Sequence, residues 1–338
     1  MKSKGGRSPR KILVYSSVFY PAIGGLENHT LFLIEEFVKA GHKVKVVTEQ
    51  VQDSSRPLEG IEVVHSSEKL KQLKLFFWSD VLYMPNITLK GVWLLLFNPF
   101  KKWVISHNDF HLMYSNDLKT KFKNFLIRRA TKNVSVSKSV ADFLKVESAV
   151  IYNCYNDDVF RLYPDESRQF DFVFVGRLVS QKGCEMLIDA CSRLSRPFSL
   201  NIIGDGVESE KLKEKVLTLG LERQIAFLGF LQNEALGRML NGHRVMIVPS
   251  LDVEGFGIVA LEGLACGCKM LVSNAGGLAE AVDGYGEIFQ MGDIGALHNL
   301  LEKCLAEAGV DEMSEGRIAY LKDHSKEIVA RKYLKALG

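Results

Sequence analysis

The sequence contains few of the features that mark secreted, membrane-spanning or fibrous proteins. Its six cysteines form no Cys-x-x-Cys pair and no set with histidines at zinc-finger spacing, so we expect buried thiols in a reducing compartment. The 28 glycines are too few for a collagen, and no heptad repeat continues along the chain. The longest apolar run, residues 92–100, is interrupted by Asn98 and Pro99, whereas a membrane-spanning helix takes about 20 apolar residues.

The N-terminal residues show no export signal. The basic stretch 2–11 is followed by the short apolar run of residues 12–20, ILVYSSVFY, which leads directly into Pro21. Such a run is typical of a first buried strand and not of a signal peptide. We therefore expect a cytoplasmic protein, peripheral on the inner face of the cell membrane if it meets a membrane at all.

Apolar residues, by contrast, are abundant. Of 338 residues, 47% are hydrophobic and 25% are charged, which is typical of globular proteins and sufficient for two domains of about 150 residues each. The net charge of +3 predicts no nucleic-acid partner, but the charge is unevenly spread. Residues 1–164 hold 24 Lys and Arg against 15 Asp and Glu, whereas residues 165–338 hold 19 against 25. The two halves are expected to meet different partners.

Short β-branched runs alternate with helical patterns along the chain. Strands are expected at residues 11–17, 43–49, 80–85, 102–107 and 133–137, and again at 170–176, 198–204, 224–229, 245–250 and 268–273. Amphipathic helices between them imply parallel sheets that are covered on both faces. We predict an α/β fold with two doubly wound Rossmann-like domains, residues 1–163 and 164–322, and a C-terminal helix at 323–338 that packs back on the first domain.

Glycines follow several of the predicted strands. They include Gly24 and Gly25 after the first strand, Gly183 in GRLVSQKG, and the GDG of residues 204–206. Ligands of doubly wound sheets bind at the carboxyl ends of the strands, where glycine lets backbone N–H groups approach an anion. Residue 209 is serine, so GDG does not extend to GxGxxG, and no P-loop occurs. A dinucleotide-dependent oxidoreductase is therefore disfavoured.

Two carboxylates flank a predicted helix start in PSLDVEGFGIVALEGLACG, residues 249–267. Glu254 lies in the loop after a strand, and Glu262 lies eight residues later on the helix. The helix N-terminus can hold a diphosphate, the loop carboxylate can reach a sugar, and the helix carboxylate can accept hydrogen bonds from a diol. Two solvated carboxylates around an ordinary helix start would give the same spacing.

A basic pair follows the strand at 170–176. Arg177 and Lys182 lie five residues apart in a glycine-containing loop, where the planar fork of an arginine and the point charge of a lysine could grip a diphosphate. Basic residues at a strand exit are also common on ordinary surfaces, so the pair alone leaves both interpretations open.

These motifs together resemble those of the family 4 retaining glycosyltransferases, which have the GT-B fold, with two Rossmann-like domains facing across a cleft. EGFGIVALE is similar to the family's E-x7-E motif, GRLVSQKG to its phosphate-binding segment, and IGGLE at 23–27 to its N-terminal glycine loop. The resemblance covers nearly the whole chain. It implies a sugar-contacting role for Glu254, a ribose-binding role for Glu262, and donor binding by Gly24, Gly25, Arg177, Lys182, Gly257, Ile258 and Val259.

His107 ends the predicted strand at 102–107. The resemblance places it where its backbone or side chain faces the transferred sugar, so it is a catalytic candidate beside Glu254. His111 follows at i+4 with Asp109 between them, which leaves a metal site as a second interpretation, although no third ligand cluster is apparent. The chain has no Asp-x-Asp motif, and we expect catalysis without a metal or other cofactor.

The resemblance thus implies transfer of a sugar from a nucleotide diphosphate sugar, with UDP as the expected nucleotide, to a glycan or lipid-linked acceptor. Two other classes stay open: a non-catalytic GT-B partner subunit or sugar-binding scaffold, and a nucleotide-sugar epimerase. Release of nucleoside diphosphate together with acceptor glycosylation would separate them.

Two basic segments supply much of the positive charge of residues 1–164. Residues 117–132, DLKTKFKNFLIRRATK, and residues 68–78, EKLKQLKLFFW, mix lysine and arginine with Leu and Phe. One interpretation is amphipathic helices whose apolar stripe, including Leu118, Phe122 and Phe125, packs on the sheet. The other is attachment to an anionic membrane surface.

Overall fold

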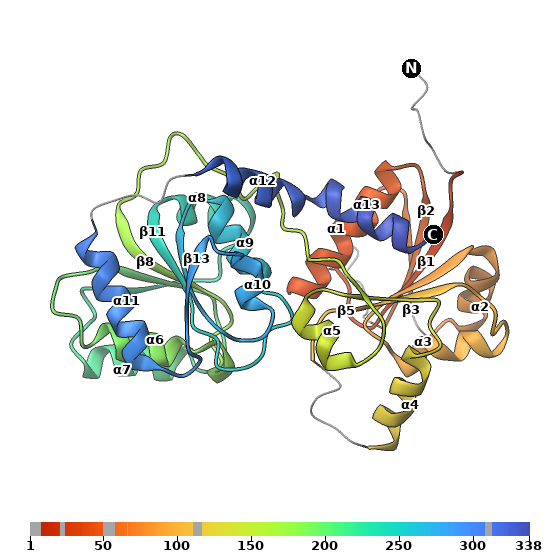
Figure 1. The fold of residues 1–338 in the computed structure, drawn as a ribbon, viewed down its shortest axis with the longest axis horizontal. Helices are drawn as coiled ribbons and strands as arrows, with labels where there is room; N and C mark the ends of the chain where they lie inside the picture. Colours follow the sequence, from red (N-terminus) through yellow and green to blue (C-terminus); the bar gives the residue numbers. More distant parts are fainter. Residues whose placement is uncertain (1–7, 21–23, 50–57, 66, 111–116, 308–312) are drawn as a thin grey trace. The chain divides into compact units, whose positions relative to one another are not determined.

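The structure is a computed structural model that describes residues 8–20, 24–49, 58–65, 67–110, 117–307 and 313–338. The chain divides into two compact units. The first unit consists of residues 1–154 together with 326–338, and the second consists of residues 155–325. Each unit has one sheet with helices on both faces, as the sequence predicts (Figure 1).

The first unit contains a seven-stranded sheet in the order β3-β2-β1-β4-β5-β6-β7. All its strand pairs are parallel. The order reverses direction beside β1, which is the arrangement of a doubly wound sheet. The strands are β1 (Lys11–Ser16), β2 (Lys43–Thr48), β3 (Ile61–His65), β4 (Val81–Pro85), β5 (Trp103–His107), β6 (Lys132–Ser135) and β7 (Ala149–Val150).

Alternation along β1 builds two separate cores in the first unit. Ile12 and Val14 belong to one buried cluster, and Leu13 and Tyr15 belong to the other, because successive side chains of a strand point to opposite faces. Helices α1 (Gly25–Lys39) and α13 (Lys326–Ala336) cover the first face, where the ring of Tyr333 meets those of His29 and Tyr83. The last helix in the sequence therefore belongs to the first unit.

The opposite face of this sheet carries four short elements. They are α2 (Lys69–Trp78), α3 (Leu89–Val92), the 3-10 helix η1 (Trp93–Leu96) and α4 (Leu118–Ile127). Each contributes buried side chains to the same cluster, including Phe76 from α2, Leu94 from η1 and Ile127 from α4. These elements form a single layer over one face of the sheet (Figure 1). Helix α5 (Lys138–Leu144) packs Phe143 and Leu144 against the same cluster.

The second unit contains a six-stranded parallel sheet in the order β10-β9-β8-β11-β12-β13. Its strands are β8 (Phe170–Val175), β9 (Leu200–Ile203), β10 (Ile225–Gly229), β11 (His243–Val248), β12 (Lys269–Ser273) and β13 (Gly286–Phe289). Its helices are η2 (Ser180–Lys182), α6 (Cys184–Cys191), α7 (Ser209–Thr218), α8 (Asn233–Asn241), α9 (Ile258–Ala265), α10 (Leu278–Val282), α11 (Ile294–Ala306) and α12 (Glu315–Asp323). Arg317 of α12 is fully buried and donates hydrogen bonds to the carbonyls of Leu264 and Cys268.

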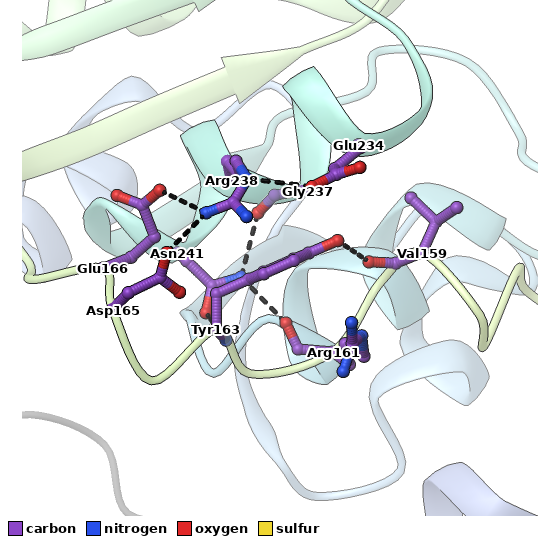
Figure 2. Close-up of polar contacts among 9 residues, drawn as sticks. All are labelled: Val159, Arg161, Tyr163, Asp165, Glu166, Glu234, Gly237, Arg238 and Asn241. Carbon is purple, nitrogen blue, oxygen red and sulfur yellow. Dashed lines mark hydrogen bonds and ion pairs between the residues drawn. The ribbon is translucent and has the colours of Figure 1, made fainter.

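The sequence predicts a boundary after residue 163, but the division between the two units lies after Cys154. The segment 155–163 belongs to the second unit because helix α8 holds it (Figure 2). The N–H of Tyr163 donates to Oδ1 of Asn241 (2.9 Å), whose Nδ2 donates to the carbonyl of Arg161 (2.8 Å). The guanidinium of Arg238 lies 4.7 Å from the centre of the Tyr163 ring. These polar contacts thus attach the segment to helix α8.

All six cysteines lie in described segments, where they are buried thiols outside any disulfide. In the part of the chain that the structure describes, no helix is long and apolar enough to cross a membrane.

Candidate functional site

The carboxyl ends of the second unit's strands meet in a group of tightly packed loops. The N–H of Leu178 donates to the carbonyl of Asp205 (2.9 Å), so the loop after β8 lies against the loop after β9. Gly204 has φ +137, and a β-carbon there would lie 1.9 Å from the carbonyl oxygen of Gly176. Gly183 has φ +71, and a β-carbon there would lie 2.0 Å from the carbonyl oxygen of Pro249. Only glycine permits these approaches, so the loops are held at backbone distance.

Lys182 and Glu254 form an ion pair within this group of loops. Lys182 ends η2, Glu254 lies in the loop after β11, and Nζ of the lysine is 2.5 Å from Oε1 of the glutamate. Ser250 donates its hydroxyl to the same carboxylate oxygen at 2.7 Å. Both partners are partly buried, so the pair is screened less than one on an open surface.

The backbone of Glu254 is fixed as well as its side chain. Its carbonyl accepts from the N–H of Gly277 (2.8 Å), and its N–H donates to the carbonyl of Ala275 (3.3 Å). These bonds form an isolated parallel bridge between Glu254 and Gly276. The loops after β11 and β12 therefore support each other and present the Glu254 carboxylate from a rigid base.

Helix α9 begins immediately after this loop. Gly257 is its N-cap with φ +98, a left-handed conformation that favours glycine. The first N–H groups of a helix have no partner within the helix, so those of Ile258 and Val259 can receive an anion at the positive end of the helix dipole. The sequence predicted all three residues as donor-binding, and the structure places them at one helix N-terminus.

Glu262 lies one helical turn beyond Ile258 on the same helix. Its side chain is half-buried, and burial raises the pKa of this carboxyl from its ordinary value of 4.5 to about 8. Within the described residues it makes no hydrogen bond or ion pair with the protein. A carboxylate without protein partners beside an anion-binding helix start is suited to accept hydrogen bonds from a ligand.

Arg177 is exposed and follows β8 on the same edge of the sheet. Its side chain is not engaged in an ion pair with any described residue, in contrast to Lys182. The structure thus joins Lys182 and Glu254 in one contact and places Arg177, Gly257 and Glu262 on the loops and helix start around it, with each role still a prediction.

In the first unit, His107 ends β5 and is fully buried. Its Nε2 lies 3.0 Å from Oδ1 of Asn133, and Nδ2 of Asn133 donates to the carbonyl of Ile127 at 3.0 Å. Because the second bond orients the amide, Oδ1 faces the histidine and Nε2 must carry a proton. The imidazole is therefore held in one orientation by a residue that the sequence did not single out, and its contact with a sugar stays a prediction.

Gly24 and Gly25 lie at the start of α1. Gly24 is the N-cap, with an extended backbone (φ −179) that any residue could adopt, and Gly25 is the first helical residue. Their place after β1 puts them at the carboxyl edge of the first sheet, where ligands of this fold class bind. Donor binding by these two glycines remains a prediction.

The same edge carries a polar group that the sequence did not reveal. Asn86, which follows β4 with φ +64, donates from Nδ2 to Asp109 (2.9 Å) and accepts from the N–H of Asn108 (2.9 Å). An asparagine tolerates this left-handed conformation better than most residues. The sequence signal available for this polar group was the Asn-Ile-Thr that directly follows a predicted strand.

His111, the second histidine of the alternative metal site, lies outside the described residues. Within the described residues, no group of three or more His, Cys, Asp or Glu is arranged to hold a metal ion.

Comparison with known proteins identifies the second unit. Residues 159–320 match the family described as glycosyl transferases group 1. The second unit is a group 1 glycosyltransferase domain. The match begins and ends within the unit formed by residues 155–325 and includes Arg177, Lys182, Glu254 and Glu262.

Relatives of this glycosyltransferase domain carry related names. An uncharacterized glycosyltransferase of Methanocaldococcus jannaschii is 34% identical over 185 residues, which cover 53% of this chain and 51% of that protein. The lipopolysaccharide 1,6-galactosyltransferase of Escherichia coli is 27% identical over 205 residues, 59% of this chain and 53% of that protein. The chain thus aligns with about half the length of each of these two relatives.

Solved structures resemble the chain over nearly its full length. Anabaena HepE in complex with UDP has a TM-score of 0.84 at 19% identity, and the match covers 97% of this chain and 99% of that chain. The glycosyltransferase of Rickettsia africae has a TM-score of 0.81 at 20% identity, covering 98% of both chains. The predicted GT-B fold, with two Rossmann-like domains, and the resemblance to this family of glycosyltransferases are therefore confirmed.

Proposed function

We propose that this protein is a retaining glycosyltransferase that moves a sugar from a nucleotide diphosphate sugar to an acceptor hydroxyl. The observation that carries the proposal is the Lys182–Glu254 pair, 2.5 Å between Nζ and Oε1, beside the N-terminus of α9. A cation, a carboxylate and a helix start at the carboxyl edge of one sheet match the charge distribution of a nucleotide diphosphate sugar.

The donor is proposed to be a UDP-sugar. Support comes from the structures of Anabaena HepE, which were determined with UDP, with UDP and glucose, and with UDP-glucose. In this proposal Arg177 and Lys182 bind the diphosphate together with the N–H groups of Ile258 and Val259. Glu262 accepts hydrogen bonds from the ribose, and Glu254 contacts the transferred sugar.

The chemistry breaks the bond between the anomeric carbon and the diphosphate oxygen and forms one to the acceptor oxygen. Negative charge develops on the departing diphosphate, and Arg177, Lys182 and the α9 N-terminus stabilise it electrostatically. The leaving phosphate takes the proton from the acceptor hydroxyl, and attack from the same face retains the anomeric configuration. Since these cationic groups could supply the charge stabilisation, the proposal requires no metal and no other cofactor.

The acceptor is proposed to be a lipid-linked or growing surface glycan, bound by the first unit. The relative from Escherichia coli is a lipopolysaccharide galactosyltransferase, and the first half of the chain carries the positive charge that anionic lipids and glycans attract. Such an acceptor would place the enzyme peripherally on the inner face of the cell membrane.

A test is the release of nucleoside diphosphate from a panel of UDP-, GDP- and ADP-sugars, with and without an extract of lipid-linked glycans. We expect acceptor-dependent release, insensitivity to EDTA, and loss of at least 100-fold in Lys182→Ala. The matched control is Lys303→Ala, which breaks the surface pair Lys303–Glu287 (3.0 Å) in the same unit.

Two outcomes favour the alternatives. If the protein binds nucleotide sugar but releases no nucleoside diphosphate with any acceptor, it is a scaffold. If it interconverts the donor sugar without an acceptor, it is an epimerase. Inversion of the anomeric configuration in the product, read by NMR, would contradict the retaining mechanism.

A further inference from the structure

Helix α4 turns most of its large apolar side chains toward solvent. Leu118 is 83% exposed and Phe122 is 50% exposed, and of the whole helix only Ile127 is fully buried. Phe122 and Phe125 stack on each other with ring centres 6.4 Å apart. The interpretation that this stripe packs on the sheet is therefore wrong for Leu118, Phe122 and Phe125, whereas Leu126 does pack against the core cluster. The helix rests on the sheet through Leu126 and Ile127 of its last turn, and the other Leu and Phe side chains face outward.

A second exposed apolar group follows η1. Phe100 is 95% exposed and Leu96 is 83% exposed, with Phe97 between them about half exposed. On α2, Leu70 and Phe77 are exposed in the same way. Large apolar side chains of this kind occur singly on most surfaces, but contiguous groups mark interaction sites.

These exposed groups belong to one layer of the first unit. The inner sides of α2, η1 and α4 all pack into the cluster over one face of the sheet, so their outer sides point away from that face (Figure 1). Two contacts join α2 to the η1 region. Nζ of Lys69 lies 5.4 Å from the centre of the Trp93 ring, and Lys101 donates to the carbonyl of Phe76 at 2.8 Å. We refer to the outer sides of α2, residues 96–100 and α4 as the apolar outer face.

Basic residues outnumber acidic ones around the apolar outer face, although Glu68 and Asp117 lie at the starts of α2 and α4 and Glu68 pairs with Lys71. No Asp or Glu occurs in residues 69–79, 89–108 or 118–141, whereas lysines and arginines occur throughout. Lys119, Lys121 and Lys123 alternate along α4, and Arg129 lies 4.5 Å over the Phe125 ring. The face therefore combines exposed Leu and Phe with an excess of positive charge.

We infer that the apolar outer face docks on an anionic lipid bilayer, with its Leu and Phe side chains inserted between headgroups and its basic residues bound to lipid phosphates. Amphipathic surfaces bind membranes through insertion of apolar side chains together with attraction between basic residues and anionic lipids. A second copy of the chain fits poorly, because a symmetric contact would bring like charges together. A nucleic acid would use aromatic rings for base stacking, and exposed Leu70, Leu96 and Leu118 serve no such contact.

The position of the face suits the proposed acceptor. Helix α2 follows β3 and α3 follows β4, and α4 comes after β5 in the chain. In a parallel sheet of this kind each helix begins at the carboxyl edge of the strand before it, so Leu70 lies near the edge where the first unit's ligand is expected. This link to a lipid-linked acceptor rests on the proposed function, whereas membrane docking itself does not.

The test is co-sedimentation with phosphatidylcholine vesicles, with and without phosphatidylglycerol. We expect wild-type protein to bind the anionic vesicles at least 10-fold more tightly than neutral ones. Raising NaCl to 0.5 M should weaken binding without abolishing it, because inserted apolar groups are not screened. Phe100→Ser with Phe122→Ser should lower affinity for anionic vesicles at least 10-fold.

The matched control is Leu217→Ser with Ile318→Ser, two exposed apolar residues of the second unit, which should leave vesicle binding unchanged. Equal loss in both double variants, or wild-type binding in the Phe100 and Phe122 variant, would overturn the inference. Two further results would overturn it in a protein that does not bind vesicles. One is a dimer that the Phe100 and Phe122 variant dissociates, and the other is binding to an RNA homopolymer. A thermal shift with UDP tests the donor site separately, so failure of docking and failure of the proposed transfer remain distinct.

Discussion

Lys182 and Glu254, 72 positions apart in the sequence, share a contact of 2.5 Å between Nζ and Oε1. The lysine proposed to hold a diphosphate is therefore already neutralised by a carboxylate. A diphosphate that reaches Lys182 has to compete with Glu254 for it. This competition makes the two residues separable by experiment, although they belong to one site.

We predict that Glu254→Gln separates nucleotide binding from transfer. Removing the negative charge frees Lys182, so UDP should bind several-fold more tightly by calorimetry, while sugar transfer falls at least 100-fold because the contact with the sugar is lost. Lys182→Ala should weaken UDP binding instead. If Glu254→Gln and Lys182→Ala weaken UDP binding equally, the competition does not exist.

Nucleotide affinity should depend on the ionisation of Glu262. Burial raises the pKa of this carboxyl to about 8, so it is protonated in the ligand-free protein at pH 7, and only the carboxylate offers two charged oxygens to accept the stronger, charge-assisted hydrogen bonds from a ribose diol. UDP binding should therefore weaken as pH falls below 8, approaching about tenfold per pH unit, with release of a proton that calorimetry in two buffers detects.

The matched variant for this prediction is Glu262→Gln. Its weaker UDP binding should be independent of pH between 6 and 8. The raised pKa also costs stability as pH rises from 4.5 toward 8, because the unfolded state ionises first. A wild-type affinity that stays constant across this range would contradict the role given to Glu262.

Loss of the Arg317 side chain should destabilise the second unit strongly. The guanidinium is fully buried and donates to the carbonyls of Leu264 and Cys268 at 2.7 and 2.8 Å. Leu264 lies in the last turn of α9, and Cys268 lies directly before β12. Arg317→Ala leaves these buried acceptors without that donor, and we expect a loss of about 3 kcal/mol in the free energy of unfolding by urea titration. Arg331→Ala, which breaks an exposed pair with Glu327, should cost about 0.3–0.5 kcal/mol.

Acid should destabilise the second unit through His243. Its ring is buried, its Nδ1 lies 2.6 Å from the carbonyl of Met239, and its Nε2 lies 2.9 Å from Nδ2 of Asn201. Burial lowers the pKa of His243 from 6.5 to about 4. The unfolded state thus binds a proton that the folded state does not, and stability should fall as pH drops from 6.5 toward 4.

Urea titrations at pH 7 and pH 5 test this prediction. His243→Gln should lose stability at both values but show a smaller drop between them, and His298→Gln, on the surface helix α11, should behave as wild type. Equal drops in wild type and His243→Gln would assign the acid sensitivity to other groups.

The central strands of both sheets could be predicted because a long run of β-branched residues between two helical patterns indicates a buried strand. The edge strands β3, β7 and β13 were not predicted. They have five, two and four residues, and short edge strands owe their conformation to pairing with a neighbour more than to their own sequence.

Sequence periodicity also failed to orient α4. It correctly predicted a helix near residues 117–132, but period alone does not say whether an apolar stripe meets a core or solvent. Ile127 is buried in the core, whereas Leu118 and Phe122 are exposed to solvent. Lys182 and Glu254 could be named from their motifs, whereas Ser250 and Asn133 could not, because a lone polar residue after or within a strand carries no signal until its partner is placed.

The first unit takes its last helix from the end of the chain, with Tyr333 of α13 packed against His29 and Tyr83. During synthesis the second unit, residues 155–325, therefore has all its residues before the first unit does. Until residues 326–338 have been synthesised, the first unit lacks α13 on the core face that α13 shares with α1. A chain truncated after residue 325 would keep every residue of the second unit but would leave His29 and Tyr83 of the first unit without the Tyr333 ring.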